Sequence, residues 1–234
     1  MKQVVLDNVN KLVCWCKKNR KCKIKESNEQ TIKVNAGSGL RVAEGWINVD
    51  AMPHAMISRW PKFALRFFYK LSGANQSFTY EEYCNIIRNN KFIHHRIEYG
   101  LPFEDCTIDY LYCSHMLEHL YREDSKIFLK HAFRVLKNKG VFRVSVPDLE
   151  YAFSRYKEGD IENTLRLFFV PTKYNYLYQH RYIYDFNLLK RFLEEAGFDV
   201  VVRRQFREGS VPDLEKLDIH AEESLFVEAT KTMN

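Results

Sequence analysis

The 234-residue chain contains no run of about 18 apolar residues of the kind that crosses a bilayer. Its first residues, MKQVVLDNVNKLVCWCKK, lack the architecture of a signal peptide. Its six cysteines are too few for a disulfide scaffold, and no second Cys/His cluster of zinc-ribbon spacing follows Cys14, Cys16 and Cys22. No internal repeat or low-complexity tract occurs. These absences predict a single globular domain over residues 1–234 that is cytoplasmic, with reduced cysteines.

The charge is modestly basic, with a net value of +6 and much of the excess between Lys17 and Lys25. We expect a basic helical extension over residues 1–30. Such a segment can contact nucleic acid, an anionic membrane or an anionic substrate, and it can equally be a solvated helix end. No RNA-binding or helix-turn-helix signature accompanies the charge.

Apolar patterning predicts strands that alternate with helices, which is typical of a mostly parallel sheet. Helices are predicted where apolar residues recur at helical spacing and where an N-cap and a terminal glycine bound the segment. The predicted strands are 31–36, 46–50, 92–98, 108–114, 140–146, 198–204 and 223–229, and the clearest helices are 125–136 and 185–196.

The first predicted strand runs into a glycine turn, Gly37-Ser38-Gly39, and the second ends at Asp50. Ligands of parallel sheets bind outside the carboxyl ends of the strands. Glycine lets the backbone approach a ligand closely, and a carboxylate can accept hydrogen bonds from a ribose diol. The turn lacks a full G-x-G-x-x-G, and about ten residues separate Gly39 from Asp50, too few for a phosphate-binding helix and a strand. A nucleoside ligand without phosphates fits this spacing better than a dinucleotide.

A second motif, SHMLEHL at residues 114–120, contains His115-x-x-Glu118-His119, a spacing found in zinc-dependent hydrolases. A catalytic zinc ion needs a third protein ligand and an open position. The remaining histidines show no diagnostic spacing relative to this motif; they are His54, His94, His95, His131, His180 and His220.

Taken in order, five segments resemble the class I S-adenosylmethionine-dependent methyltransferases, and most closely the small type-11-like branch found in glycan-synthesis settings. The segments are VNAGSGLRVAEGWINVD, GLPFEDCTIDYLYCSHMLEHL, HAFRVLKNKGVFRVSVPDLE, YIYDFNLLKRFLEEAGF and LDIHAEESLFVEATK, which together span nearly all of residues 31–231. The resemblance implies a Rossmann-like α/β fold with a seven-stranded sheet, an antiparallel last strand, helical insertions and S-adenosyl-L-methionine as cofactor. It also implies no metal at SHMLEHL, so we expect none.

The resemblance assigns roles to residues at the strand ends. Asn35, Ala36, Gly37, Ser38 and Gly39 would surround the amino-acid end and the sulfonium of the cofactor. Asp50 would hold the ribose, Leu101, Pro102 and Phe103 would lie by the adenine, and Ser114 and His115 would close the pocket.

This chain departs from the family pattern in three places. Arg96 stands where relatives often carry an acid, which leaves Glu98 as a substitute adenine contact. Ala36 replaces a larger apolar residue. Residues 52–91 form an insertion of about forty residues between the second and third strands.

The insertion includes Ile57–Leu71, in which aromatic and basic residues alternate. This stretch is either an amphipathic helix packed on the domain, or an acceptor cap or peripheral membrane contact. A second candidate cap, on the acceptor side, covers residues 151–184 and is rich in tyrosine; its tyrosines are Tyr151, Tyr156, Tyr174, Tyr176, Tyr178, Tyr182 and Tyr184. Aromatic rings suit sugars, and they also fill cores.

Methyl transfer to a hydroxyl needs a base near the acceptor. The candidates, in order, are Asp148 at the end of the fifth strand, His115 at the end of the fourth, and His180 in the second cap. Each has a structural alternative: a helix N-cap for Asp148, a wall of the cofactor pocket for His115 and a surface position for His180.

The sequence therefore predicts a methyltransferase that O-methylates a sugar hydroxyl in a glycan or a lipid-linked glycan precursor. An RNA or small-molecule acceptor is the alternative, and an inactive methyltransferase-fold binding module is an alternative of another class. The sequence leaves the oligomeric state open.

Overall fold

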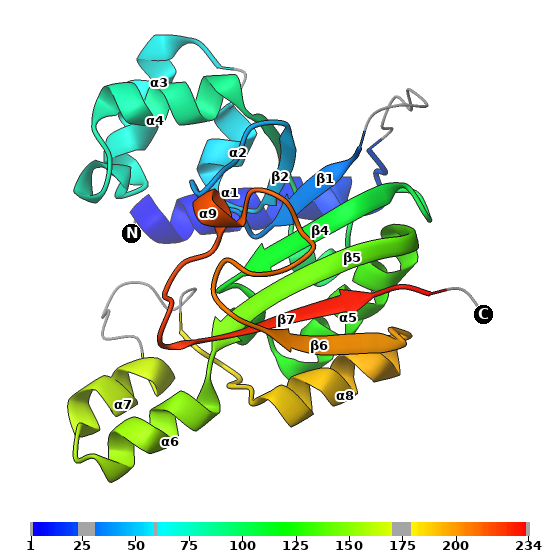
Figure 1. Cartoon of the computed structure of the whole chain (residues 1–234). Helices are drawn as coiled ribbons and strands as arrows, with labels where there is room; N and C mark the ends of the chain where they lie inside the picture. The colour runs from blue at the N-terminus through cyan, green and yellow to red at the C-terminus, as the bar shows by residue number, and fades with distance from the viewer. Residues whose placement is uncertain (1, 23–30, 59, 170–178, 233–234) are drawn as a thin grey trace.

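The computed structural model describes residues 2–22, 31–58, 60–169 and 179–232. At its centre is a seven-stranded sheet in the order β3-β2-β1-β4-β5-β7-β6 (Figure 1). All neighbouring strands are parallel except at β7, which is antiparallel to both β5 and β6. The expected fold class and its antiparallel last strand are therefore confirmed. The strands are β1 (Lys33–Ala36), β2 (Trp46–Asp50), β3 (Lys91–His94), β4 (Ile108–Ser114), β5 (Leu136–Pro147), β6 (Val200–Arg204) and β7 (Ser224–Thr230).

The third strand is shorter than the sequence predicts. It ends at His94, and the chain then turns into the 3₁₀ helix η2 (Ile97–Tyr99). His94 pairs with Asp50, the last residue of β2, so no partner strand remains for residues 95–98. The expectation of a strand up to residue 98 was wrong because pairing, and not apolar content, sets the strand's end.

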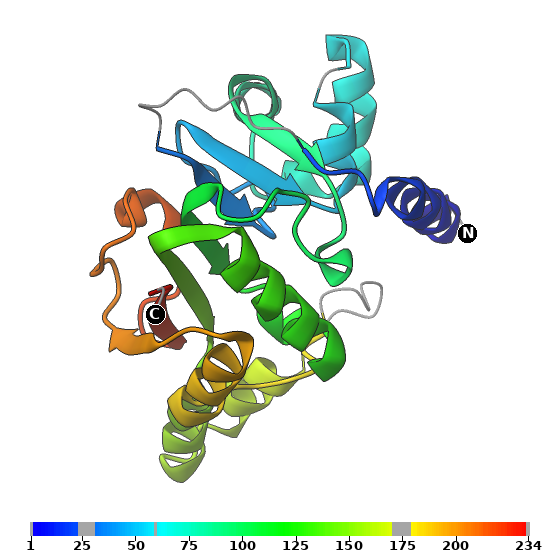
Figure 2. The same ribbon diagram turned by 90° about the vertical axis from the view of Figure 1, so that its right-hand side faces the viewer.

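Helices α5 (Arg122–Val135) and α8 (Phe186–Ala196) cover one face of the sheet (Figure 2). The ends of α8 match the sequence prediction. The Asp185 carboxylate accepts a hydrogen bond from the Leu188 amide at 2.7 Å, and Gly197 follows the helix with φ of 115°. A single apolar core lies between these helices and the sheet, with Phe128, Phe142 and Leu193 at its centre.

The opposite face is covered by the segment that joins β6 to β7, including the short helix α9 (Leu214–Leu217). A buried ion pair holds this segment. Arg143 on β5 donates two hydrogen bonds to Asp218, at 3.0 and 2.6 Å, and two more to the carbonyls of Gln205 and Glu208. Neither side chain of the ion pair is exposed. The pair fixes the loop that follows β6 against the sheet.

Two helical insertions flank the carboxyl ends of the parallel strands (Figure 1). The first consists of α2 (Pro53–Ile57), α3 (Lys62–Leu71), η1 (Ala74–Gln76) and α4 (Tyr80–Asn89) and has a small apolar core of its own. The second is the hairpin of α6 (Leu149–Lys157) and α7 (Ile161–Phe168). The helices of the first insertion lie within residues 52–91, and the α6–α7 hairpin overlaps the predicted 151–184 cap but begins two residues before it, at Leu149.

The N-terminal helix α1 (Lys2–Lys17) packs beside β2 and β3. The Asn10 amide donates to the Ala51 carbonyl at 2.7 Å, and His94 donates to the Asn10 side-chain oxygen at 2.6 Å. The expected helical extension is thus observed over Lys2–Lys17, and residues 23–30 lie outside the described part of the chain. Among the described residues, no helix has the length and apolarity needed to traverse a bilayer.

Candidate active site

The glycine turn follows β1 at the carboxyl edge of the sheet. Gly37 and Gly39 have φ values of +71° and +51°, a region that L side chains rarely adopt. A Cβ on Gly37 would lie 2.4 Å from Cγ of Met116, in the segment after β4. Gly37 is therefore required both by the backbone angle and by the close approach of two strand ends.

Asp50 braces this turn. Its carboxylate accepts a hydrogen bond from the Gly39 amide at 2.7 Å and another from the Met52 amide at 2.6 Å. A carboxylate offers about four lone-pair sites, so sites remain for a ribose diol. The predicted ribose role of Asp50 is compatible with this geometry and stays a prediction.

The other turn residues are held tightly. The Asn35 amide donates to the Arg41 carbonyl at 2.9 Å, and the Ala36 side chain lies in the main core. Ser38 is buried, and its hydroxyl is 3.4 Å from the Gly39 carbonyl. Ala36 can therefore meet a cofactor only through its backbone.

His54, on α2, was not predicted as a cofactor residue. Its side chain is buried, its Nε2 has no hydrogen-bond partner, and it lies in the electrostatic neighbourhood of Asp50. Burial lowers the pKa of His54, which keeps the ring neutral. The signal in the sequence was its position four residues after the acid that ends β2.

Ser114 ends β4 and His115 follows it, beside the glycine turn. Ala36 pairs with Cys113, so the residues that follow these two strands are neighbours. The Ser114 hydroxyl accepts a hydrogen bond from Ser145 at 2.7 Å. His115 has a positive φ of 47°, and its Nε2 is 2.8 Å from the Ser224 hydroxyl.

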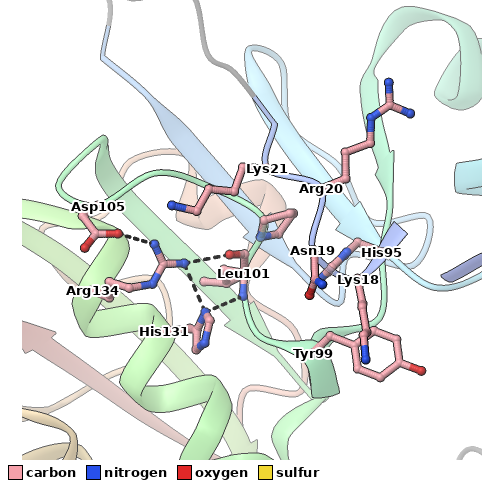
Figure 3. Close-up of a pocket in the computed structure, with 11 residues that line it drawn as sticks. Lys18, Asn19, Arg20, Lys21, His95, Tyr99, Leu101, Asp105, His131 and Arg134 are labelled. Atoms are coloured by element: carbon pink, nitrogen blue, oxygen red, sulfur yellow. Dashed lines mark hydrogen bonds and ion pairs between the residues drawn. The ribbon is translucent and has the colours of Figure 1, made fainter. Parts of the chain in front are cut away.

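Leu101 and Pro102 line a cavity of about 350 Å³ between the 18–21 segment and α5 (Figure 3). His131 accepts a hydrogen bond from the Leu101 amide at 3.2 Å, and Arg134 donates to the Leu101 carbonyl at 2.9 Å. No residue of the glycine turn lines this cavity. Its wall is mostly basic; the lining residues with ionisable or basic side chains are Lys18, Arg20, Lys21, His95, Tyr99, Asp105, His131 and Arg134.

Arg96, which stands where relatives often carry an acid, contacts Glu98. Its guanidinium forms an ion pair with the Glu98 carboxylate, the group that was predicted to contact the adenine in place of the missing acid. The adenine contact through Glu98 stays a prediction.

Asp148, the first candidate base, serves as the N-cap of α6. One carboxylate oxygen accepts a hydrogen bond from the Glu150 amide at 2.9 Å, and the other accepts one from Arg203 at 2.8 Å. Burial raises the pKa of Asp148. Both oxygens thus have structural partners, which is the alternative role that the sequence allowed.

The second and third candidate bases, His115 and His180, both lie near one buried carboxylate. Glu118, in the 3₁₀ helix η3 (Leu117–His119), is fully buried; its Oε1 lies 3.3 Å from Nδ1 of His115 and 4.0 Å from Nε2 of His119. The His180 ring lies 5.1 Å from that of His119, and the His220 ring 4.8 Å from that of His115. We call these five residues the histidine row.

The electrostatics of the histidine row favour a charged carboxylate. Burial acts to raise the pKa of Glu118, but His115 and His119 bring it below its ordinary value. Burial lowers the pKa values of His119 and His220. Neither Glu118 oxygen has a hydrogen-bond partner. Sequence reasoning treated Glu118 only as part of a rejected zinc motif and missed its central position.

The two insertions expose apolar side chains near this edge. On α3, Leu65 and Phe68 are buried, whereas Phe63 and Phe67 are 81% and 64% exposed. On the α6–α7 hairpin the exposed apolar residues are Phe153, Tyr156, Ile161 and Leu165. Of the tyrosines predicted for the second cap, Tyr182 and Tyr184 pack into the main core, and Tyr174, Tyr176 and Tyr178 lie outside the described residues.

Comparison with known proteins agrees with this fold. A family model described as a methyltransferase domain matches residues 61–144, from the first insertion to β5. The matched range excludes the glycine turn and Asp50. No curated protein sequence matches the chain.

Solved structures with a similar fold include the apo form of the S-adenosylmethionine-dependent methyltransferase SibL, at 15% identity and a TM-score of 0.52, covering 88% of this chain and 52% of that protein. Others are a SAM-dependent methyltransferase from Archaeoglobus fulgidus, at 17% identity and a TM-score of 0.49 over 96% of this chain and 94% of that one, and one from Thermotoga maritima, at 16% and 0.47 over 87% and 83%. The chain spans about half the length of SibL. The family match and the sheet topology support S-adenosylmethionine as cofactor and methyl transfer as the reaction class.

Proposed function

We propose that the protein is an S-adenosylmethionine-dependent methyltransferase that O-methylates a sugar hydroxyl in a glycan or a lipid-linked glycan precursor. The observation that carries the proposal is the register of β1 and β4. Ala36 pairs with Cys113, so the glycine turn and the histidine row follow adjacent strand ends. A cofactor on the turn would present its methyl group beside a set of proton-accepting groups.

The sulfonium of the cofactor is an activated leaving group, so the protein mainly aligns the acceptor and excludes water. Asp50 would accept hydrogen bonds from the ribose through its remaining lone pairs. The amides and small side chains of the turn leave room for the amino-acid end of the cofactor.

We propose His115 as the base, ahead of Asp148. Both oxygens of Asp148 already have partners. His115 instead places Nδ1 beside the Glu118 carboxylate and Nε2 beside a serine hydroxyl. A carboxylate at Nδ1 holds the proton there and leaves Nε2 to accept one, the arrangement of a carboxylate-oriented imidazole base. An acceptor hydroxyl would replace Ser224 at Nε2.

Two exposed aromatic surfaces support a saccharide acceptor near a membrane. The α6–α7 hairpin offers Phe153 and Tyr156 to a sugar ring. Helix α3 exposes Phe63 and Phe67 beside Arg66, the composition of a peripheral contact with anionic lipid. A lipid-linked precursor would account for both surfaces: its sugar would contact the α6–α7 hairpin, and α3 would contact the membrane that holds its lipid.

The test combines cofactor binding with methyl transfer. Calorimetry should give micromolar binding of S-adenosylmethionine and of its demethylated product. Asp50→Asn should weaken binding by about tenfold or more, because one charge-assisted hydrogen bond contributes about 1.5–3 kcal/mol. Asp109→Asn is the control, since Asp109 is also a hydrogen-bonded strand aspartate, although partly exposed, and lies at the end of β4 away from Ser114.

Transfer is then measured with labelled cofactor and saccharide or lipid-linked glycan fractions. A gain of one methyl group on a defined saccharide, lost in His115→Ala, supports the proposal. Cofactor binding without transfer to any fraction would favour a binding module instead.

The basic cavity favours a second candidate, an RNA acceptor. Lys18, Arg20, Lys21 and Arg134 line it beside the predicted adenine residues (Figure 3). RNA binding would weaken steeply with salt through counterion release, whereas saccharide binding would tolerate salt. Nucleic acid that leaves the purified protein only at high salt would displace the glycan proposal.

A further inference from the structure

The Glu118 carboxylate is buried without a hydrogen bond, and this raises a question of charge. Transferring an ionised carboxylate away from water is costly unless a cation or several donors compensate it. Glu118 is fully buried, neither of its oxygens has a hydrogen-bond partner, and its nearest polar neighbours are imidazoles. Among the described residues, the imidazoles of His115 and His119 are therefore the groups that offset the charge of this carboxylate.

The tautomers of the two neighbouring histidines follow from their backbone contacts. Nδ1 of His119 lies 3.3 Å from the Gln179 carbonyl, and Nδ1 of His180 lies 2.5 Å from the Leu167 carbonyl. A carbonyl only accepts, so Nδ1 carries the proton in each ring. In the neutral rings Nε2 then carries the lone pair, and backbone carbonyls behind Nδ1 are the usual outer partners of metal-bound histidines.

Three of these side chains lie close enough together to share one ion. Glu118, His119 and His180 each offer a ligand atom, and these atoms lie within 4.8 Å of one another. Two histidines and one carboxylate are the protein ligands of many catalytic zinc and iron sites, with further positions left open. Ligands of a tetrahedral ion lie roughly 3.4 Å apart, so no pair would need to close by more than about 1.4 Å on binding.

Contrary to the expectation of no metal at SHMLEHL, we propose that Glu118, His119 and His180 bind a divalent transition-metal ion. His115 lies outside this set and contacts Oε1 of Glu118 through Nδ1, at 3.3 Å. The His119 side chain is 20% exposed, so the ion would reach solvent and an incoming acceptor. If the proposed methyl transfer is correct, the ion would bind the acceptor hydroxyl and favour loss of its proton.

The site does not depend on that activity and is tested by metal binding alone. The whole chain is stripped with a chelator and titrated separately with Zn²⁺ and Mn²⁺ in a calorimeter. We expect one ion per chain and a rise in melting temperature with ion concentration. Loading with Co²⁺ should give the visible absorption bands of a histidine-coordinated ion.

Glu118→Gln keeps the side-chain shape and removes the charge, and it should weaken binding by about 100-fold or more, since even outer partners of metal ligands account for 10- to 100-fold. His180→Asn removes a ligand on a segment away from the core and keeps the test valid if Glu118→Gln fails to fold. His131→Asn is the control, because His131 is likewise a half-buried histidine, with Nδ1 accepting a hydrogen bond from the Leu101 amide, but lies on α5, outside the set. Uptake of no ion by the wild type, or equal uptake by His180→Asn, Glu118→Gln and the wild type, would overturn the proposal.

Discussion

Substituting Gly37 by alanine tests the contact on which the cofactor turn depends. The new Cβ would lie 2.4 Å from Cγ and 2.7 Å from Cβ of Met116, closer than real Cβ contacts. The φ of +71° adds a conformational cost of about 1 kcal/mol for a non-glycine residue. Overpacking adds about 1–3 kcal/mol. We expect Gly37→Ala to lower the free energy of unfolding by about 2–4 kcal/mol.

Gly73→Ala separates the two contributions. Gly73 has nearly the same φ, +75°, but a Cβ there would meet no atom within 4 Å. This variant should lose only about 1 kcal/mol. The difference between the two variants therefore measures the contact with Met116.

Urea unfolding gives both free energies, and calorimetry gives the affinity for S-adenosylmethionine. We expect Gly37→Ala to bind the cofactor at least about tenfold more weakly, or 1.4 kcal/mol, because the turn must shift and carry the Gly39 amide away from Asp50. In a double-mutant cycle, Met116→Ala should recover about 1 kcal/mol of the loss in stability. Equal losses in Gly37→Ala and Gly73→Ala, with additive effects in the cycle, would refute the reasoning.

Three further predictions concern stability and surface contacts. Asp218→Ala leaves the fully buried Arg143 without its carboxylate and should lower the free energy of unfolding in urea by about 3–5 kcal/mol. The control Lys126→Ala breaks the half-exposed pair with Glu195 and should lower it by less than about 1 kcal/mol. Similar losses in the two variants would contradict a stabilising role for the buried pair of Arg143 and Asp218. Burial lowers the pKa of His94 from 6.5 to about 4, so as the pH falls the unfolded chain binds a proton before the folded chain does. The free energy of unfolding should therefore fall by about 1–3 kcal/mol between pH 6.5 and pH 4. His94→Gln should flatten this pH dependence, and an unchanged slope would exclude His94 as its source. The double variant Phe63→Ser/Phe67→Ser should abolish sedimentation of the protein with anionic lipid vesicles. Its melting temperature should stay unchanged, because both rings are largely exposed. Vesicle binding equal to that of the wild type would remove α3 from the membrane proposal.

The sequence predicted much of the architecture because its signals are local. Strand β4 has the predicted bounds, and Asp185 and Gly197 bound α8 as expected, since capping and the left-handed turn act within a few residues. The glycine turn after β1 and the acid at the end of β2 follow the same logic. Where a strand's end depended on a partner, as at His94, the local signal failed.

The tertiary structure alone decided how the candidate side chains are used. Asp148 was predicted from its position at a strand end, but Arg203, from β6, occupies one of its oxygens. That partner is 55 residues away, and no periodicity in the sequence connects the two.

The histidine row shows the same division. The sequence by itself determined that His115, Glu118 and His119 fall within one short segment after a strand. It held no signal that His180 would join them, because the spacing of 61 residues matches no metal motif. His180 lies there because the segment that follows it is hydrogen-bonded to η3. The amides of Arg181 and Tyr182 both donate to the Glu118 carbonyl, at 2.7 and 3.2 Å. Backbone hydrogen bonds between distant segments thus bring the proposed ligands together, and the residue types in the sequence do not indicate which segments pair.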